Sequence, residues 1–287
     1  MTCKPLVVVN AKTVCLKRDF GLMGIVNLTT DSFYPASRTL MHTAAIKKCI
    51  DLWNQGADIL DLGAESSRPG ASPLGMGVEI SRLLPVIMAL KHSVPSAILA
   101  VDTWHATTAQ TVLEQGAHII NDISACRFDP GLVDVLAQYK PGYILVHNPG
   151  SFGMLPSKSK SPDIIADLEK FFTDVLTKLV KAGLPEDRVI LDPGIGFAKS
   201  HADNLTILQN IAALETLGRP LLVGLSHKRL FEGLLGLDVA ERSTVTQVAT
   251  ALLWERGVVW HRVHDVGKAL EVLTLASYFG QHRLRSC

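Results

Sequence analysis

Short runs of Val, Ile and Leu recur along the whole chain, and each run gives way at once to a polar side chain. The runs are too short for helices, and their lack of alternation is typical of strands that are buried on both faces. Parallel strands of this kind need covering segments between them. The eight runs occupy residues 22–28, 59–62, 98–101, 119–123, 143–146, 189–191, 221–225 and 258–263.

Most segments between these runs have the apolar spacing of helices. The clearest lies between residues 164 and 180, where large apolar side chains return every three or four positions. Asp129-Pro130 and Ser161-Pro162 each place a capping side chain before a proline, which predicts two helix starts. Strands that alternate with helices allow a doubly wound open sheet or an eight-stranded barrel.

The polar residues that follow the runs distinguish these two folds. An open sheet gathers its ligands where the strand order reverses, whereas a TIM barrel builds its site from the loops after all its strands. Every run here ends in a polar residue, so we predict an α/β fold of the TIM (β/α)8 barrel type. These residues are Asn27, Glu65, Asp102, Asn121, His147, Asp192, Ser226 with Lys228, and Arg262 with His264.

The first twenty residues precede this repeat. Residues 6–10 and 13–16 flank Ala11-Lys12, which predicts a short β-hairpin covering one barrel end. We expect a single domain over 1–287, because no change in composition divides the chain. It would consist of the hairpin (1–20), the barrel (21–279) and a C-terminal tail (280–287).

Three of the loops after strands are long and rich in Pro, Ser and Gly. We expect them to be mobile lids over the barrel mouth, although plain surface loops would have the same composition. The loops cover residues 30–39, 66–77 and 149–162.

Composition argues against several classes of protein. The formal charge of +1 and the pI of about 7.7 provide no broad basic surface for nucleic acid or an anionic membrane. No apolar run is long enough to cross a bilayer, and neither a P-loop nor a Rossmann glycine motif follows a strand. The five cysteines have neither metal-site spacing nor the density of a disulfide framework, so we expect a cytoplasmic protein with reduced thiols.

Carboxylate and amide side chains end three of the strands. Such groups can hydrogen-bond the donor edge of a polar heterocycle at the barrel mouth. Asp192, which precedes Pro193-Gly194, would by itself also fit the first position of a turn. The three residues are Asp102, Asn121 and Asp192.

Cationic side chains follow other strands. In a nearly neutral chain they indicate a bound oxyanion such as phosphate or pyrophosphate, although a buried ion-pair network would use the same residue types. Their places at strand ends favour the ligand. His264 lies two residues after Arg262 on the same strand face, so both can reach one ligand. The cationic set is Arg68, Lys228, Arg262 and His264.

Asn27 ends the first strand of the barrel, immediately before the oxygen-rich residues 29–32. These residues could hold Mg²⁺ together with a phosphate, because Mg²⁺ keeps several waters and needs only one or two protein oxygens. A turn cluster that caps a loop would have the same composition, so these residues leave both interpretations open.

Seven blocks of sequence join these residues into a known order. They are MGIVNLTTDSF (23–33), DLGAESSRPGA (61–71), VDTWHA (101–106), GAHIINDISA (116–125), LDPGIGFAK (191–199), LVGLSHK (222–228) and RVHDV (262–266). In this order and over almost the whole chain, they resemble the dihydropteroate synthase family of pterin-binding TIM barrels.

The resemblance implies a transferase of folate biosynthesis. It would join 4-aminobenzoate to 6-hydroxymethyl-7,8-dihydropterin diphosphate, giving 7,8-dihydropteroate and pyrophosphate, with Mg²⁺ as cofactor. It also implies a homodimer and inhibition by sulfonamides, which mimic 4-aminobenzoate.

The resemblance assigns roles to individual positions as well. Asp102, Lys228, Arg262 and His264 would be catalytic, and Asn27 would be linked to Mg²⁺. The substrate-binding residues would be Asp102, Asn121, Asp192, Phe197 and Lys228 towards the pterin and its partner, Ser67, Arg68, Arg262 and His264 towards the diphosphate, and Arg229 towards 4-aminobenzoate.

The chain departs from the family pattern in two places. In the first loop, Thr30 replaces a usual proline and Tyr34-Pro35-Ala36 replaces a Ser-Asp-Gly-Gly run. Arg229 replaces a serine that helps to hold the aminobenzoate carboxylate, so it would either strengthen or obstruct that contact. These changes keep two alternatives open: a degenerate paralogue that binds pterin without synthase activity, and a pterin-dependent methyltransferase on the same barrel.

Overall fold

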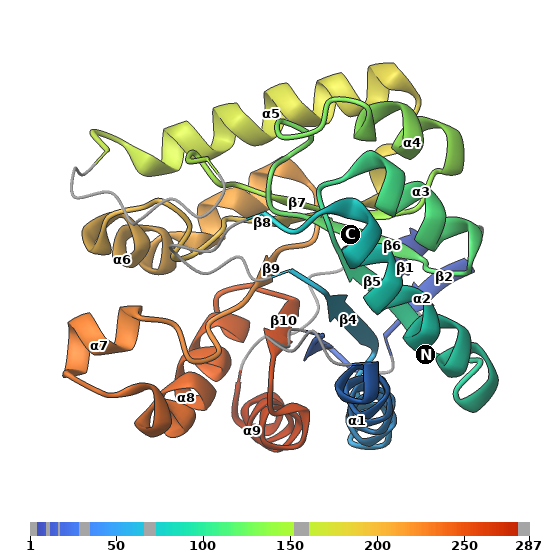
Figure 1. Cartoon of the computed structure of the whole chain (residues 1–287). Helices are drawn as coiled ribbons and strands as arrows, with labels where there is room; N and C mark the ends of the chain where they lie inside the picture. The colour runs from blue at the N-terminus through green and yellow to red at the C-terminus, as the bar shows by residue number, and fades with distance from the viewer. Residues whose placement is uncertain are drawn as a thin grey trace.

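Eight parallel strands form a barrel at the centre of the computed structural model, which describes residues 5–9, 12–16, 18–28, 35–65, 73–151 and 161–280 (Figure 1). The strand order is β8-β7-β6-β5-β4-β3-β10-β9. A bridge between Leu191 and Leu221, supported by the Leu191 N–H donating to the Pro220 carbonyl at 2.9 Å, joins the two ends of this order. The predicted TIM barrel is therefore confirmed. The strands are β3 (Gly21–Asn27), β4 (Ile59–Gly63), β5 (Ile98–Asp102), β6 (Ile119–Asp122), β7 (Gly142–Val146), β8 (Val189–Asp192), β9 (Leu222–Val223) and β10 (Trp260–Val263).

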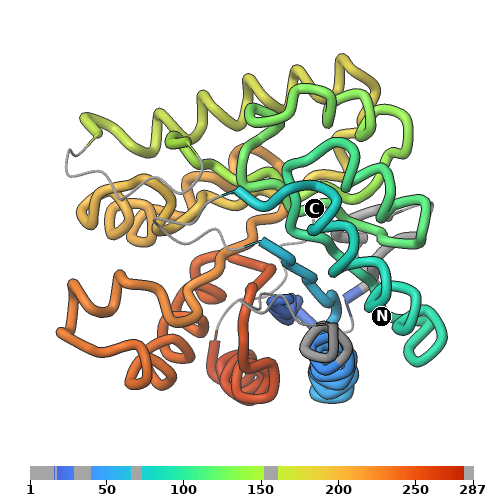
Figure 2. Tube along the Cα trace, viewed as in Figure 1, coloured from blue at the N-terminus to red at the C-terminus, as the bar shows by residue number. Residues whose placement is uncertain are grey.

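Helices follow the strands and surround the barrel, as the traces in Figures 1 and 2 show. Short 3-10 helices interrupt three of the connections in the described chain. The helices are α1 (Pro35–Asn54), α2 (Met76–Ser93), α3 (Ala106–Glu114), α4 (Leu132–Tyr139), α5 (Ile164–Ala182), α6 (His201–Gln209), α7 (Leu230–Leu235), α8 (Ser243–Trp254) and α9 (Val266–Phe279), with η1 (Glu186–Arg188), η2 (Ile211–Leu217) and η3 (Val239–Glu241).

Helix starts differ from the sequence predictions. The Asp163 side chain, and not that of Ser161, caps α5 by accepting the Ala166 N–H at 3.0 Å. Asp129 likewise does not cap α4; its carboxylate accepts the Ala106 N–H at the start of α3, 2.8 Å away. Which side chain caps a helix therefore depends on which backbone N–H lies within reach in the folded chain. Pro130 and Pro162 both lie before the first residue of the helix that follows them.

Two predicted loops are shorter than expected because helices begin inside them. Helix α1 starts at Pro35 and α2 starts at Met76, within the segments predicted as loops at 30–39 and 66–77. Proline at a first helical position has a backbone angle suited to the helix and lacks an N–H that would otherwise need a partner. Residues 30–34 and 66–72 of these loops, with Thr30, Ser67 and Arg68, lie outside the described residues.

The predicted N-terminal hairpin is present. Strands β1 (Pro5–Val9) and β2 (Lys12–Cys15) pair antiparallel, with Val9 opposite Lys12. Strand β1 lies against β7 and against η1, which immediately precedes β8. The hairpin therefore covers the end of the barrel from which the strands start. Leu16, directly after β2, packs against the cluster of apolar side chains inside the barrel.

A cluster of apolar side chains fills the barrel interior. Trp260 is fully buried in it, and a Cβ on the neighbouring Gly21 would lie 2.3 Å from the Trp260 ring. Glycine is therefore required at position 21 so that the indole can fill the barrel. The interior cluster comprises Met23, Ile59, Ala100, Ile119, Ile144, Val146, Ile190, Leu222 and Trp260. A larger cluster between strands and helices forms the outer core.

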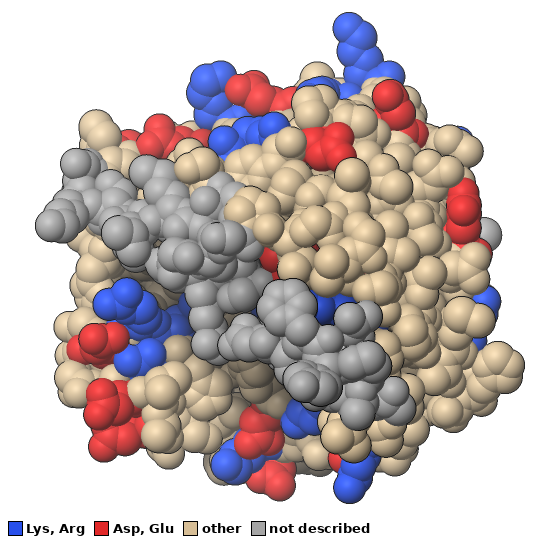
Figure 3. Space-filling view, viewed as in Figure 1, with Lys and Arg blue, Asp and Glu red and all other residues tan. Residues whose placement is uncertain are grey.

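No helix in the described part of the chain is long and apolar enough to cross a membrane. On the face that Figure 3 shows, acidic and basic side chains are interspersed outside the grey atoms, and neither sign of charge forms a continuous patch there. This distribution agrees with the near-zero net charge.

Candidate active site

Inside the barrel, polar side chains of five strands lie one inward-facing position beyond apolar ones. Successive inward-facing residues of a strand are two positions apart, so each polar residue stands two positions after an apolar one. Three of these pairs are Ile119 with Asn121, Ile190 with Asp192, and Trp260 with Arg262; Ile59 with Asp61 and Ala100 with Asp102 follow the same rule. The sequence thus places a polar floor at the end of the barrel where the strands end.

Strand register brings the predicted residues Asn27, Asp102 and Asn121 together, whereas Glu65, predicted for β4, is not among these pairings. Asn27 is level with Gly63, Gly63 with Asp102, and Asp102 with Asn121, in three successive parallel pairs. Because these pairings are in line, the three polar side chains point into one region of the mouth. Gly63 leaves the space between them open: a Cβ there would lie 3.7 Å from Asn27 Oδ1 and 3.6 Å from the Asp102 Cβ.

Arg262 forms the centre of an ion-pair network on this floor. Its Nε donates to Asp61 Oδ2 at 2.7 Å, and its Nη2 lies 2.6 Å from the same oxygen and 3.0 Å from Asp102 Oδ2. Asn121 Nδ2 also donates to Asp61 Oδ2, at 3.3 Å. The arrangement matches the ion-pair network that the sequence allowed, but the Arg262 side chain remains 22% exposed at the mouth.

Asp61 is a site residue that the sequence reasoning missed. It stands in the middle of a strand run and not at its end, so the search for polar strand ends passed over it. Its side chain is fully buried, and its Oδ1 has no hydrogen-bond partner among the described residues. An acid two residues after the inward-facing Ile59 was the available signal, because alternation places both on one face.

Asp192 and Lys228 form the opposite side of the floor. Asp192 Oδ1 accepts the Gly194 N–H at 2.7 Å, which turns the chain directly after β8. Lys228 Nζ donates to the Ile195 carbonyl at 2.8 Å and lies 4.5 Å from the centre of the Phe197 ring. The structure therefore brings Asp192, Phe197 and Lys228 together, as the sequence predicted for a common site.

Burial changes the acidity of these groups. Burial raises the pKa of Asp102 to about 7, against the opposing attraction of Arg262. Burial also raises the pKa of Asp192, opposed by the Gly194 N–H and Lys228, and it lowers the pKa of Lys228 to about 8. Desolvated groups of this kind favour a ligand that supplies hydrogen bonds in place of water.

His264 lies at the end of β10 beside Arg262. Its Nδ1 is 2.8 Å from the Ser226 hydroxyl, which follows β9 and orients the imidazole. The His227 ring lies 5.6 Å from the His264 ring. The two residues predicted to face a diphosphate, Arg262 and His264, thus share one side of the mouth.

Arg229 occupies a different environment. Its side chain is 69% exposed, and its Nε lies 3.6 Å from Glu232 of α7. Arg229 follows Lys228 directly, so it stands at the rim of the mouth and does not contribute to the floor. Its guanidinium keeps enough freedom to meet an incoming anion, because an exposed ion pair of this length holds it only weakly.

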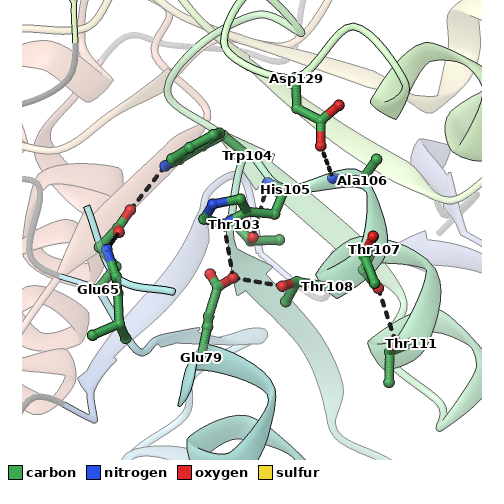
Figure 4. A network of polar contacts seen from close by, with 11 residues as sticks. Glu65, Glu79, Thr103, Trp104, His105, Ala106, Thr107, Thr108, Thr111 and Asp129 are labelled. Carbon is green, nitrogen blue, oxygen red and sulfur yellow. Dashed lines mark hydrogen bonds and ion pairs between the residues drawn. The ribbon is translucent and has the colours of Figure 1, made fainter. Parts of the chain in front are cut away.

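A second polar network joins α2 and Glu65 to the segment that links β5 to α3 (Figure 4). The fully buried Glu79 of α2 accepts from the Thr108 hydroxyl at 2.5 Å and lies 3.0 Å from His105 Nδ1. The Glu65 carboxylate accepts the Trp104 indole N–H at 2.8 Å, and the Leu74 N–H also donates to it. Glu65 was predicted as a strand-end residue; Glu79 was missed because it lies inside a helix pattern.

The described residues contain no group of three or more His, Cys, Asp or Glu side chains arranged to hold a metal ion. Asn27 offers one exposed amide-bearing side chain level with Asp102. This sparse donor set fits a Mg²⁺ ion that takes most of its ligands from water and from substrate phosphate oxygens.

Comparison with known proteins agrees with this geometry. Residues 23–264 match the model of a family described as pterin binding enzyme. Dihydropteroate synthase of Synechocystis sp. is 34% identical over 256 residues, which make up 89% of this chain and 88% of the relative.

Solved structures give the same result. Dihydropteroate synthase of Xanthomonas albilineans with 4-aminobenzoic acid has a TM-score of 0.87 at 34% identity and covers 96% of this chain and 98% of its own. The same enzyme in complex with 7,8-dihydropteroate has a TM-score of 0.83 at 31% identity, with the same coverage. The chain therefore belongs to the dihydropteroate synthases, within the family of pterin binding enzymes.

Proposed function

We propose that this chain condenses 6-hydroxymethyl-7,8-dihydropterin diphosphate with 4-aminobenzoate to 7,8-dihydropteroate and pyrophosphate. The observation that carries the proposal is the polar floor, where buried carboxylates and an amide stand beside Arg262 and His264 in one barrel mouth. The acceptors suit the N–H edge of a pterin, and the cations suit its diphosphate. A methyl transfer from a folate would need no such cations.

The carboxylates would bind the pterin and stabilise its cationic form. The bond between the pterin methylene carbon and the diphosphate oxygen breaks, and its electron pair leaves with the diphosphate. The methylene carbon gains positive charge, which the buried Asp102 and Asp192 stabilise best as carboxylates. The 4-aminobenzoate nitrogen then forms a bond to that carbon and releases a proton to water.

Arg262 and His264 would bind the departing diphosphate. The Arg262 guanidinium bonds Asp61 and Asp102 along one edge, which fixes its plane while part of it stays exposed at the mouth. Ser226 fixes the imidazole of His264. Groups held in place before the reaction lower the barrier most, because they need no reorganisation as charge develops. Ser67 and Arg68 are proposed to complete this anion site.

We propose Mg²⁺ as the cofactor and Asn27 as its protein contact. The ion, when bound, would neutralise charge on the leaving diphosphate. Asn27 stands level with Gly63 and near Asp102, so its side chain would be available to an ion bound at this part of the mouth.

Lys228 would bind the pterin, and Phe197 beside it and Arg229 would bind 4-aminobenzoate. The Phe197 ring and the Lys228 ammonium stack beside each other at the mouth, which suits an aromatic ring with a carboxylate. Arg229 at the rim would attract that carboxylate in place of the family's usual serine.

We also propose a homodimer formed through α8 and α9. These helices pack side by side and expose large apolar side chains on their outer surfaces. The exposed fraction is 53% for Val248, 50% for Leu252, 57% for Leu275, 82% for Tyr278 and 79% for Phe279. An apolar patch of this kind on an enzyme surface is typical of a subunit interface.

A cytoplasmic location is likewise a proposal. Cys49 and Cys126 are buried free thiols, and burial raises the pKa of each to about 12. Such thiols stay protonated and unreactive, which agrees with a protein that keeps its cysteines reduced.

The test is an incubation of the purified chain with the pterin diphosphate and Mg²⁺, with and without 4-aminobenzoate. Pyrophosphate and dihydropteroate are both followed. We expect the two products in equal amounts, only with both substrates, and a much slower reaction after chelation by EDTA. Binding of the pterin diphosphate without dihydropteroate formation would instead support a degenerate pterin-binding paralogue.

A further inference from the structure

Lys199 is a buried lysine at the end of the loop that joins β8 to α6. Only 2% of it is exposed, although lysine is among the residues least often buried. Burial lowers the pKa of its ammonium to about 7, against the attraction of Asp192. Burying an ammonium ion costs free energy, so hydrogen bonds to the ammonium must offset that cost.

The Lys199 ammonium holds together the loops after two adjacent strands. It donates to the carbonyl of His147, which follows β7, at 2.7 Å. It also donates to the carbonyls of Gly194 and Phe197, in the loop after β8, at 2.9 and 3.4 Å. An ammonium has three N–H donors, and three carbonyl oxygens receive them here.

The loop after β8 fits closely against the end of β7. The His147 N–H donates to the Asp192 carbonyl at 2.8 Å. Gly194 has a φ of +66°, and a Cβ there would lie only 2.1 Å from the His147 carbonyl oxygen. Glycine allows this approach because it has neither a Cβ nor a penalty for positive φ. Lys199 donates a hydrogen bond to the same His147 carbonyl and so stabilises this close contact between the two loops.

The segment that Lys199 holds carries one side of the site. The Gly194 N–H binds Asp192 Oδ1 at 2.7 Å, and the Ile195 carbonyl accepts the Lys228 ammonium at 2.8 Å. The Phe197 ring lies beneath that ammonium. A shift of the segment would therefore displace Asp192, Phe197 and Lys228 together.

We propose that Lys199 is a positioning residue for pterin binding, which fixes the segment 192–197 against the end of β7. It touches no substrate itself; it acts through Asp192, Phe197 and Lys228. The inference rests on the proposed function, because it takes the pterin diphosphate as the ligand of this site.

The test replaces the ammonium with an apolar chain of similar length, Lys199→Met. The dissociation constant of the pterin diphosphate is measured by calorimetry with Mg²⁺ and without 4-aminobenzoate, so that turnover does not interfere. We expect it to rise at least tenfold in Lys199→Met. The control is Leu273→Ala in α9, far from the segment, where a fully buried side chain is shortened. It should lower the melting temperature and leave the dissociation constant within twofold of the wild type.

A second variant keeps the test decisive if Lys199→Met does not fold. Gly194→Ala places a methyl group against the His147 carbonyl and should also weaken pterin binding at least tenfold. A folded Lys199→Met or Gly194→Ala protein that binds within twofold of the wild type would overturn the inference. If the wild type itself does not bind the pterin diphosphate, the proposed function fails instead.

Discussion

Asp102 lies 3.0 Å from the Arg262 guanidinium, so its charge depends on both its burial and this partner. Burial dominates and raises its pKa to about 7. A carboxyl group with that pKa can hold a proton near neutral pH, and the ligand that it binds then decides its state. Single residues of this floor are therefore sensitive probes of the proposed chemistry.

Replacing Asp102 with Asn should lower kcat/KM for the pterin diphosphate by about 10²- to 10³-fold, as for the loss of one preorganised contact in other sites. The amide keeps the shape of the side chain but removes the charge that stabilises the cationic pterin. Steady-state kinetics would measure the effect. Asp174→Asn, on the exposed surface of α5, is the matched control and should retain wild-type kinetics.

The pH dependence of kcat/KM should be bell-shaped. Below about pH 7 the raised pKa of Asp102 means that the carboxyl gains a proton and loses its charge, so the rate falls with decreasing pH. Above about pH 8 Lys228, whose pKa burial lowers to about 8, loses its proton, so the rate falls with increasing pH. Because the groups interact, the two limbs report apparent values for the site. An acid limb that persists unchanged in Asp102→Asn would contradict this assignment.

Arg229 should affect only the second substrate. Its exposed guanidinium can contribute about 0.5–1 kcal/mol to binding a carboxylate, so Arg229→Ser should raise the KM for 4-aminobenzoate by about 2- to 5-fold. The KM for the pterin diphosphate should stay the same. The effect should shrink in high salt, since an exposed ion pair is screened. The double variant Arg229→Ser, Thr30→Pro should also differ from the wild type in its inhibition by sulfonamides; equal inhibition of the two proteins would contradict the proposal.

At the scale of elements, strand register determines which polar residues meet. Asn27, Asp102 and Asn121 end three different strands, and they are brought level by the pairings of β3, β4, β5 and β6. The alternation within each strand then places an apolar layer beneath them. The positions of the polar side chains therefore depend on the packing of this apolar layer, which includes the contact of β3 with β10.

Gly21→Ala tests that packing. A methyl group at position 21 would overlap the Trp260 ring inside the barrel, so the variant should lose about 1–3 kcal/mol of unfolding free energy through overpacking. Urea denaturation measures the loss. Gly77→Ala in α2 is the matched control, because a Cβ there meets nothing within 4 Å, and alanine should stabilise that helix by up to about 1 kcal/mol. Equal free energies of unfolding for Gly21→Ala and the wild type would contradict this prediction and would show that the Trp260 ring can move to make room for the methyl group.

At the scale of the whole molecule, α8 and α9 expose large apolar side chains on the outside of the barrel. Burying these side chains between two copies would remove apolar surface from water. The substitutions Leu252→Glu and Tyr278→Glu should therefore convert a dimer into a monomer in sedimentation velocity at micromolar concentration. The exposed substitution Lys178→Glu on α5 is the control and should remain dimeric. A wild type that sediments as a monomer would rule out the proposed homodimer.

The amino-acid sequence by itself determined the strands and the fold. Each apolar run became a strand within a few residues of its predicted ends, although β9 is shorter than the run from Leu221 to Leu225. These features are local: a run of β-branched residues, the turn after it and the helix that follows interact over short distances along the chain. Most candidate site residues were also visible, because polar side chains at strand ends interrupt the apolar pattern.

Only the tertiary structure decided which of these side chains touch. Asp61 binds Arg262 across 201 positions of sequence, and Lys199 reaches the carbonyl of His147 across 52. Neither contact can be predicted from the sequence pattern, because an acid or a lysine that will be buried has the same local sequence context as an exposed one. Their roles follow from barrel closure and strand register, which bring distant residues to one floor where desolvation makes every unpaired charge costly.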